Sequence, residues 1–173
     1  DGAVMRWGAV GASPESLSLG SGILGLTVVP GGGVIARAHH GHIAAIGAGE
    51  PVRLDACQGT KFTAGRAAVA VHPREPVAAV ALPGEDIVVV RDLAAGSQHR
   101  RAVSLPAFPA LAYSREGQLA VSVGGHAVLV LDGRDEGSAR ELRLPEQATS
   151  LAWIGEFELA LVGDQGSLMR ADV

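Results

Sequence analysis

Short apolar runs separated by turn-forming residues recur along the whole chain at a spacing of about forty residues. Four segments read as an apolar run, a turn and a second apolar run, and their reference positions are Leu26, Val69, Leu111 and Leu151. The steps between these positions are 43, 42 and 40 residues. A recurrence of this length is the sign of a repeat architecture, in which each unit buries its apolar faces against its neighbours.

Each repeat predicts four β-strands. In the third complete repeat these cover residues 110–113, 119–123, 127–131 and roughly 141–144. The signals are short runs rich in Val, Leu and Ile, bounded by Gly, Pro, Asp or Ser. No window keeps a 3.6-residue apolar period over the length of a helix, so we expect almost no helix.

The first strand of each repeat alternates large and small residues. Leu111 and Tyr113 flank Ala112, and Leu26 and Val28 flank Thr27 in the same way. Large residues on one face and small residues on the other favour sheets that stack face to face, because the large side chains of one sheet fill the space left by the small side chains of the next. We therefore expect both faces of these sheets to be buried away from water.

The fourth strand has a different pattern, in which apolar and polar residues alternate. Leu142 and Leu144 flank Arg143, and Val103 and Leu105 flank Ser104. Alternation marks a strand with one side in water, so the fourth strand is predicted to be the outer edge of its sheet.

The chain begins and finishes on similar sequences, `DGAVMRW` at residues 1–7 and `QGSLMRAD` at residues 165–172. In this alignment Gly2 matches Gly166 and Met5 matches Met169. Both segments are interpreted as the third strand of a repeat, in two different units.

A period near forty with four strands per unit resembles the WD-repeat family of β-propellers. The segments `VVVRDL`, `VLVLDG` and `LMRADV` keep the family's aspartate after the third strand, at Asp92, Asp132 and Asp172, and `DGAVMRWG` has its tryptophan at Trp7. The segment `AVHP` at 70–73 resembles the family's first-strand ending. The Gly-His pair that precedes the first strand in the family is missing here, so aliphatic packing is expected to hold the units together.

The predicted fold class is therefore all-β, a β-propeller of four-stranded antiparallel blades forming a partial ring of about four to five blades. The expected organisation is one WD-repeat-like segment over residues 1–173. It comprises a partial blade at 1–20, blades at about 21–55, 66–105 and 108–145, and a partial blade at 148–173. A truncated arc of a larger ring is favoured over a compact five-bladed ring.

Composition narrows the classes of partner. The net charge of −4 argues against a nucleic-acid partner, which would require a basic face. No apolar run reaches the roughly 18 residues that a membrane helix needs, so no membrane partner is expected. Cys57 is the single cysteine, which favours a reducing, cytoplasmic compartment. The abundance of Ala, Gly, Val and Arg suggests a bacterial source.

The densest group of chemically active side chains is `AHHGH`, with His39, His40 and His42. It is placed at the turn between the second and third strands, where Gly41 bends the chain. Its spacing matches no zinc pattern, so solvated hairpin histidines are the preferred interpretation. The glycine-rich segments at 30–33 and 47–51 join strand to strand and lack the Lys-Ser/Thr of a phosphate loop. No catalytic residue, metal or cofactor is predicted.

A binding rim is the remaining candidate site. The connection at 56–66 is longer than its counterparts, and the family resemblance implies that it lies on the rim where partners dock. A loop that only packs on itself is the alternative interpretation of this connection, and it is slightly favoured. The residues expected on this rim are His40, His42, Lys61, Phe62, Arg66, Glu85, Phe108 and His126.

The resemblance implies a non-enzymatic scaffold or sensor domain, part of a larger signalling or complex-forming protein, that binds protein partners and adjoins further blades or domains. Two alternatives stay open. One is a propeller-type enzyme with catalytic groups at the central channel, although the inner strands offer mainly Val, Leu, Ala, Tyr113 and Trp153. The other is a structural domain that gates an attached catalytic domain.

Overall fold

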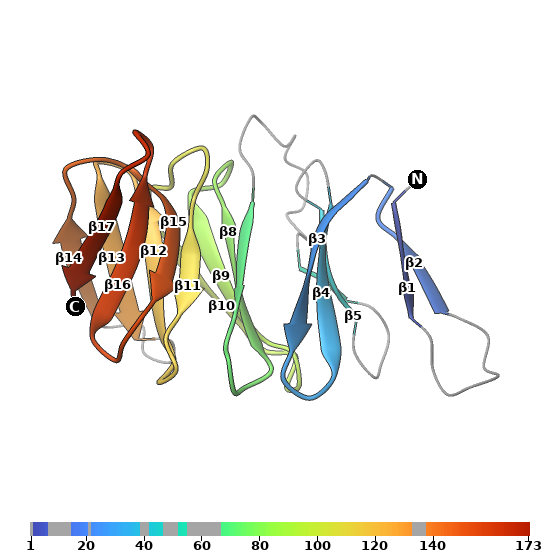
Figure 1. Ribbon diagram of the computed structural model, residues 1–173. Helices are drawn as coiled ribbons and strands as arrows, with labels where there is room; N and C mark the ends of the chain where they lie inside the picture. Colours follow the sequence, from blue (N-terminus) through green and yellow to red (C-terminus); the bar gives the residue numbers. More distant parts are fainter. Residues whose placement is uncertain are drawn as a thin grey trace. The chain divides into compact units, whose positions relative to one another are not determined.

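The computed structural model resolves two compact units, Asp1–Phe62 (unit 1) and Thr63–Val173 (unit 2) (Figure 1). Each unit is described by itself. The structure describes residues 2–6, 15–20, 22–38, 42–46, 52–54, 67–132 and 138–173.

Unit 1 contains two antiparallel sheets. The strands are β1 (Ala3–Arg6), β2 (Glu15–Ser18), β3 (Ile23–Val29), β4 (Gly33–Ala38), β5 (Ile43–Ile46) and β6 (Val52–Arg53). The first sheet pairs β1 with β2, and the second has the order β3-β4-β5-β6. Each strand of the second sheet therefore pairs with its neighbour along the chain, as a meander does.

Unit 2 contains three antiparallel sheets of the same kind. The strands are β7 (Ala68–Val71), β8 (Val77–Leu82), β9 (Ile87–Asp92), β10 (Gln98–Ala102), β11 (Leu111–Tyr113), β12 (Gln118–Val123), β13 (Ala127–Asp132), β14 (Ala139–Arg143), β15 (Ala148–Trp153), β16 (Glu158–Gly163) and β17 (Leu168–Asp172). They form the β7–β10, β11–β14 and β15–β17 sheets, each in chain order.

These sheets confirm the predicted all-β class and the four-strand repeat. Within the described residues no helix occurs, and none there could therefore cross a membrane. The predicted fourth strands lie at sheet edges, where β10 and β14 pair only with the third strand beside them. Their sequences, `QHRRA` and `ARELR`, leave most side chains exposed. Charged residues on an edge strand discourage pairing with another chain.

The sheets of unit 2 pack face to face through large residues set against small ones. Leu111 and Tyr113 of β11 pack in one core with Ala70, Ala79 and Ala81 of the preceding sheet. The small side chains leave room for the large ones, and each sheet removes apolar surface of its neighbour from water. This contact is the predicted packing of large side chains on one sheet against small side chains on the next.

The same contact repeats one sheet further along. Leu151 and Trp153 of β15 pack in a second core with Ala112 and Ala120 of the β11–β14 sheet. The strand β11 contacts both β7 and β15, so the first strands of successive sheets are neighbours. A four-stranded sheet thus buries both its faces only when it has a sheet on either side.

In unit 1 the prediction that both faces of each sheet are buried is wrong for β3. Leu26 and Val28 are 60% and 75% exposed. Among the described residues the adjoining sheet has two strands, and its apolar residues pack with Ala36, Ala38 and Ala44 on the same face as Leu26. Two strands cover only the half of the face that lies over β4 and β5, so the β3 half stays in water.

Two of the three first strands of unit 2, β7 and β11, end in the same capping arrangement. The Nδ1 atom of buried His72 accepts hydrogen bonds from the backbone N–H groups of Arg74 and Glu75, at 3.1 and 2.9 Å. The Oγ atom of buried Ser114 accepts the N–H groups of Glu116 and Gln118, at 3.2 and 3.0 Å. His72 and Ser114 each follow the last residue of a first strand, so two different residue types hold the same turn.

Two aromatic residues occupy matching positions at the end of the first strand, and their polar atoms differ in environment. The indole N–H of Trp153 donates to the carbonyl oxygen of Ala112 at 3.1 Å. The hydroxyl of Tyr113 is buried without a hydrogen-bond partner among the described residues, and its ring lies edge-on to His72 at 5.4 Å between centroids. Burial raises the pKa of Tyr113 far above its ordinary value.

We expect Tyr113→Phe to raise the free energy of unfolding by about 1 kcal/mol, because the variant no longer buries an unpaired hydroxyl. Urea denaturation of the two proteins measures this difference. Trp153→Phe is the matched control, since it removes a donor that is satisfied, and should lower stability by at least about 1 kcal/mol. Destabilisation by Tyr113→Phe of similar size would contradict the assignment of an unpaired hydroxyl.

Candidate interaction surface

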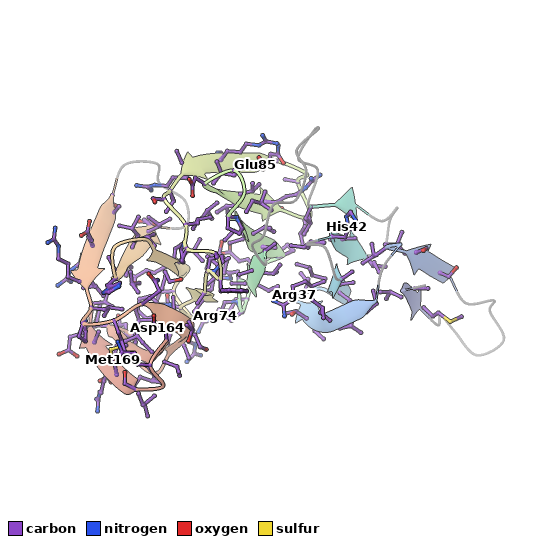
Figure 2. All side chains as sticks on the ribbon, turned by 90° about the horizontal axis from the view of Figure 1, so that it is seen from above. Arg37, His42, Arg74, Glu85, Asp164 and Met169 are labelled. Atoms are coloured by element: carbon purple, nitrogen blue, oxygen red, sulfur yellow. The ribbon has the colours of Figure 1, made fainter. Side chains whose placement is uncertain are left out.

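The topology of unit 2 brings its second turns and its inter-sheet connections to one end. Because the strands of each sheet alternate in direction, the turns β8–β9, β12–β13 and β16–β17 lie at the end where the connections 103–110 and 144–147 run. We call this end the linker end, which is the upper end of unit 2 in Figure 1. Figure 2 looks down on it and labels Glu85 and Asp164 on two of its turns.

Each connection is tied to the turn of the sheet that follows it. The backbone N–H of Gly124 donates to the carbonyl oxygen of Ser104 at 2.9 Å, and that of Asp164 donates to Gln147 at 2.9 Å. The side-chain amide of Gln147 also donates to the carbonyl oxygen of Val123 at 3.2 Å. These bonds hold the loops of the linker end against the sheets, so the surface is built on a rigid support.

Two of the turns share an unusual backbone conformation. Asp86 and His126 each precede a third strand, with positive φ angles of 51° and 57°. Their carbonyl oxygens accept the backbone N–H groups of Val103 and Leu144, at 2.8 and 2.7 Å, where the fourth strands end. The carboxylate of Asp86 also accepts the N–H of Leu105 at 2.9 Å. Hydrogen bonds from the residues that follow the fourth strands thus hold this backbone conformation. The conformation in turn orients the side chains of the turn.

Glu146 is a buried carboxylate at the linker end. It accepts hydrogen bonds from the hydroxyl of Ser167 and, at 2.8 Å, from the backbone N–H of Gln165. The Ser167 hydroxyl, followed by the Gln165 N–H, lowers the pKa of Glu146, while burial acts in the opposite direction. A side chain at Gly163 would overlap the carboxyl group of Glu146 and would force it to move.

The sequence interpretation missed Glu146, because `LPEQ` contains the residue types of any surface turn. Its bonding partners lie 19 and 21 residues further along the chain. The only signal available was a carboxylate two residues before a first strand, in a repeat whose later turn is `GDQGS`. That signal is weak without the fold.

The structure places three of the predicted rim residues at one end of unit 2. Glu85 lies half-buried in the β8–β9 turn, Phe108 lies in the connection before β11 with 58% of its surface exposed, and His126 is exposed before β13. All three are at the linker end. His42 occupies the position before β5 in unit 1 and is half-buried. His40, Lys61, Phe62 and Arg66 lie outside the described residues.

The described part of the linker end offers hydrogen-bonding groups and exposed apolar surface. Across the described residues, no group of three or more His, Cys, Asp or Glu side chains could hold a metal ion. Glu146 is engaged by Ser167 and Gln165, so its role is to hold the β16–β17 turn. The exposed side chains of the linker end are the groups that a partner can contact.

Comparison with known proteins adds information about the fold alone. No family model matches the chain, and no curated protein matches it. Among solved structures, the chain is similar to the crystal structure of the computationally designed Ika4 protein, with a TM-score of 0.59 and 16% sequence identity. The similarity covers 90% of this chain and 94% of that one.

We expect Glu146→Gln to lower the melting temperature at neutral pH, because it removes the charge that the Ser167 and Gln165 donors stabilise. Since the pKa of Glu146 is lowered in the folded state, its contribution is present above the unfolded pKa and is lost as the pH falls through the folded value. The gap in melting temperature between the two proteins should therefore close as the pH falls below about 4.3.

Thermal melts of both proteins from pH 7 to pH 3, followed by circular dichroism, measure this gap. Glu85→Gln is the matched control, because it removes a carboxylate from another turn of the same end. A gap for Glu146→Gln that stays constant over the whole pH range would contradict the assignment.

Proposed function

We propose that this chain is a segment of a WD-repeat-like β-propeller, in which each four-stranded sheet is a blade. Three features support the proposal. The sheets are separate four-stranded meanders, their first strands are neighbours within unit 2, and successive sheets pack face to face. Radial repetition of such sheets is the arrangement that defines a propeller.

The proposed activity is non-enzymatic binding of a protein partner at the linker end, as a scaffold or sensor within a larger protein. The observation that carries it is the exposed Phe108, which lies in a connection whose residues Val103 and Ser104 are hydrogen-bonded to the turns that carry Glu85 and His126. An aromatic side chain flanked by polar groups is typical of the anchors that dominate binding energy in protein interfaces. Loops on a rigid support are where binding residues concentrate.

The remaining predicted rim residues belong to the same proposal. The sequence pattern predicts that His40, His42, Lys61, Phe62 and Arg66 belong to the corresponding turns and connections of the repeat, where they would extend the surface with cations and a second aromatic ring. The net charge of −4 gives no general attraction for nucleic acid, so a protein is the proposed partner.

Affinity capture with the immobilised chain tests the proposal, and the molecule provides a matched pair of variants. Phe108 at the linker end and Phe157 in the β15–β16 turn at the opposite end are both 58% exposed. We expect Phe108→Ser to reduce recovery of the bound partner by about tenfold or more, the effect of losing an interface anchor. Phe157→Ser should leave recovery unchanged.

Quantitative mass spectrometry of the captured proteins gives the readout, and circular dichroism verifies that both variants are folded. Equal recovery with Phe108→Ser and Phe157→Ser would overturn the linker end as the binding surface. It would leave the sheet architecture unaffected.

A further inference from the structure

The outer edge of the β7–β10 sheet is an unpaired strand edge that is rich in cations. The strand β10 pairs with β9 alone, and its sequence is `QHRRA`. The sheet has all four strands of the repeat, and in unit 2 neighbouring sheets pack on the faces of a sheet. Stacking of sheets therefore leaves this edge open.

The register between β9 and β10 decides which backbone groups of β10 point outward. The backbone N–H of Val103 donates to the carbonyl oxygen of Asp86 at 2.8 Å. Because hydrogen-bonded pairs alternate along an antiparallel ladder, every second residue of β10 counted back from Val103 is bonded to β9. The residues between them are Gln98, Arg100 and Ala102, whose N–H and C=O groups face away from the sheet. Among the described residues these groups have no partner, so another strand can pair with them.

The arginines of this edge carry charge that the described residues do not neutralise. Arg100 is exposed and Arg101 is half-buried, and neither has an ion-pair partner in the described part of the chain. The carboxylates at the two ends of β9 are used elsewhere. Asp86 accepts the N–H of Leu105, and Asp92 accepts two backbone N–H groups of the β9–β10 turn. The edge is therefore positive although the net charge of the chain is −4.

These two properties together indicate which kind of molecule can occupy the edge. A second copy of β10 would place arginine beside arginine, which is unfavourable across a strand pair. A nucleic acid could neutralise the arginines, but it has no amide groups to pair with alternating N–H and C=O groups. An extended peptide with carboxylate side chains meets both requirements.

We propose that β10 is a docking edge for an acidic segment of a partner protein, which adds to the sheet as a further strand. Successive side chains of β10 point to opposite faces, so carboxylates of the segment stand beside Arg100 on one face and beside Arg101 on the other. Main-chain hydrogen bonds supply affinity in this mode of binding, and the side chains select the sequence. The proposal uses the side of the sheet instead of the linker end, so it does not depend on the proposed function.

Fluorescence anisotropy tests the selection by charge. The probe is a short labelled peptide of valine and threonine with glutamates at its centre, and the comparison peptide has lysines in their place. We expect the glutamate peptide to bind with a Kd below about 1 mM, and the lysine peptide at least about tenfold more weakly. Arg100→Glu should weaken binding of the glutamate peptide by about tenfold, because it reverses a cross-strand charge pair. Arg140→Glu makes the same change on the exposed edge strand β14 and should leave binding unchanged.

A proline substitution tests the backbone pairing separately from the charge. Proline is accepted on an edge strand where the N–H faces away from the sheet, so Ala102→Pro removes an outward donor without breaking the ladder. We expect it to weaken binding of the glutamate peptide by about tenfold or more. Ala139→Pro is the matched control at an outward-facing position of β14. Circular dichroism verifies that all variants are folded.

Hydrogen exchange measured by NMR gives a second readout of strand pairing. The bound glutamate peptide should slow exchange of the outward amides of Gln98, Arg100 and Ala102, because each becomes a donor to the added strand. Attraction between charges alone would leave these rates unchanged.

Four results would overturn the proposal. They are no binding of the glutamate peptide up to about 1 mM, equal binding of the glutamate and lysine peptides, binding to Ala102→Pro as tight as to the unaltered chain, and displacement of the peptide by a single-stranded DNA at equal concentration. The last result would indicate a general anion site.

Discussion

The contact of large side chains on one sheet with small side chains on the next is the interaction on which the rest of this structure depends. A sheet of four short strands has two apolar faces and too little thickness to bury either of them alone. Leu111 and Tyr113 lie over alanines of one sheet, and Leu151 and Trp153 lie over alanines of the next. Each added sheet removes the exposed face of the previous one from water and presents a new face in its place.

This dependence explains why the two units differ in burial although their strands follow one pattern. In unit 2 each first strand after β7 has a four-stranded sheet before it, and its large residues are packed. In unit 1 the sheet before β3 has two strands, and Leu26 and Val28 remain in water. The same sequence pattern thus yields a buried or an exposed residue according to how many strands the neighbour supplies.

The turns and connections add specificity to this packing. Bonds such as those from Gly124 to Ser104 and from Asp164 to Gln147 hold each connection against the sheet that follows. Glu146 holds the β16–β17 turn with a charged acceptor, and His72 and Ser114 hold turns at the opposite end. A rigid frame with polar turns is what allows an exposed side chain such as Phe108 to remain in a defined place.

The amino-acid sequence by itself determined the strands, their order and their outer edges, because alternation and turn chemistry act over a few residues. It also placed Glu85, Phe108 and His126 at one end, since strand direction follows from counting strands. Only the tertiary structure decided that Glu146 is buried and that Leu26 and Val28 are exposed. The burial of Glu146 depends on partners about 20 residues away along the chain, and the exposure of Leu26 and Val28 depends on the width of a neighbouring sheet. The local sequence pattern does not report either of these.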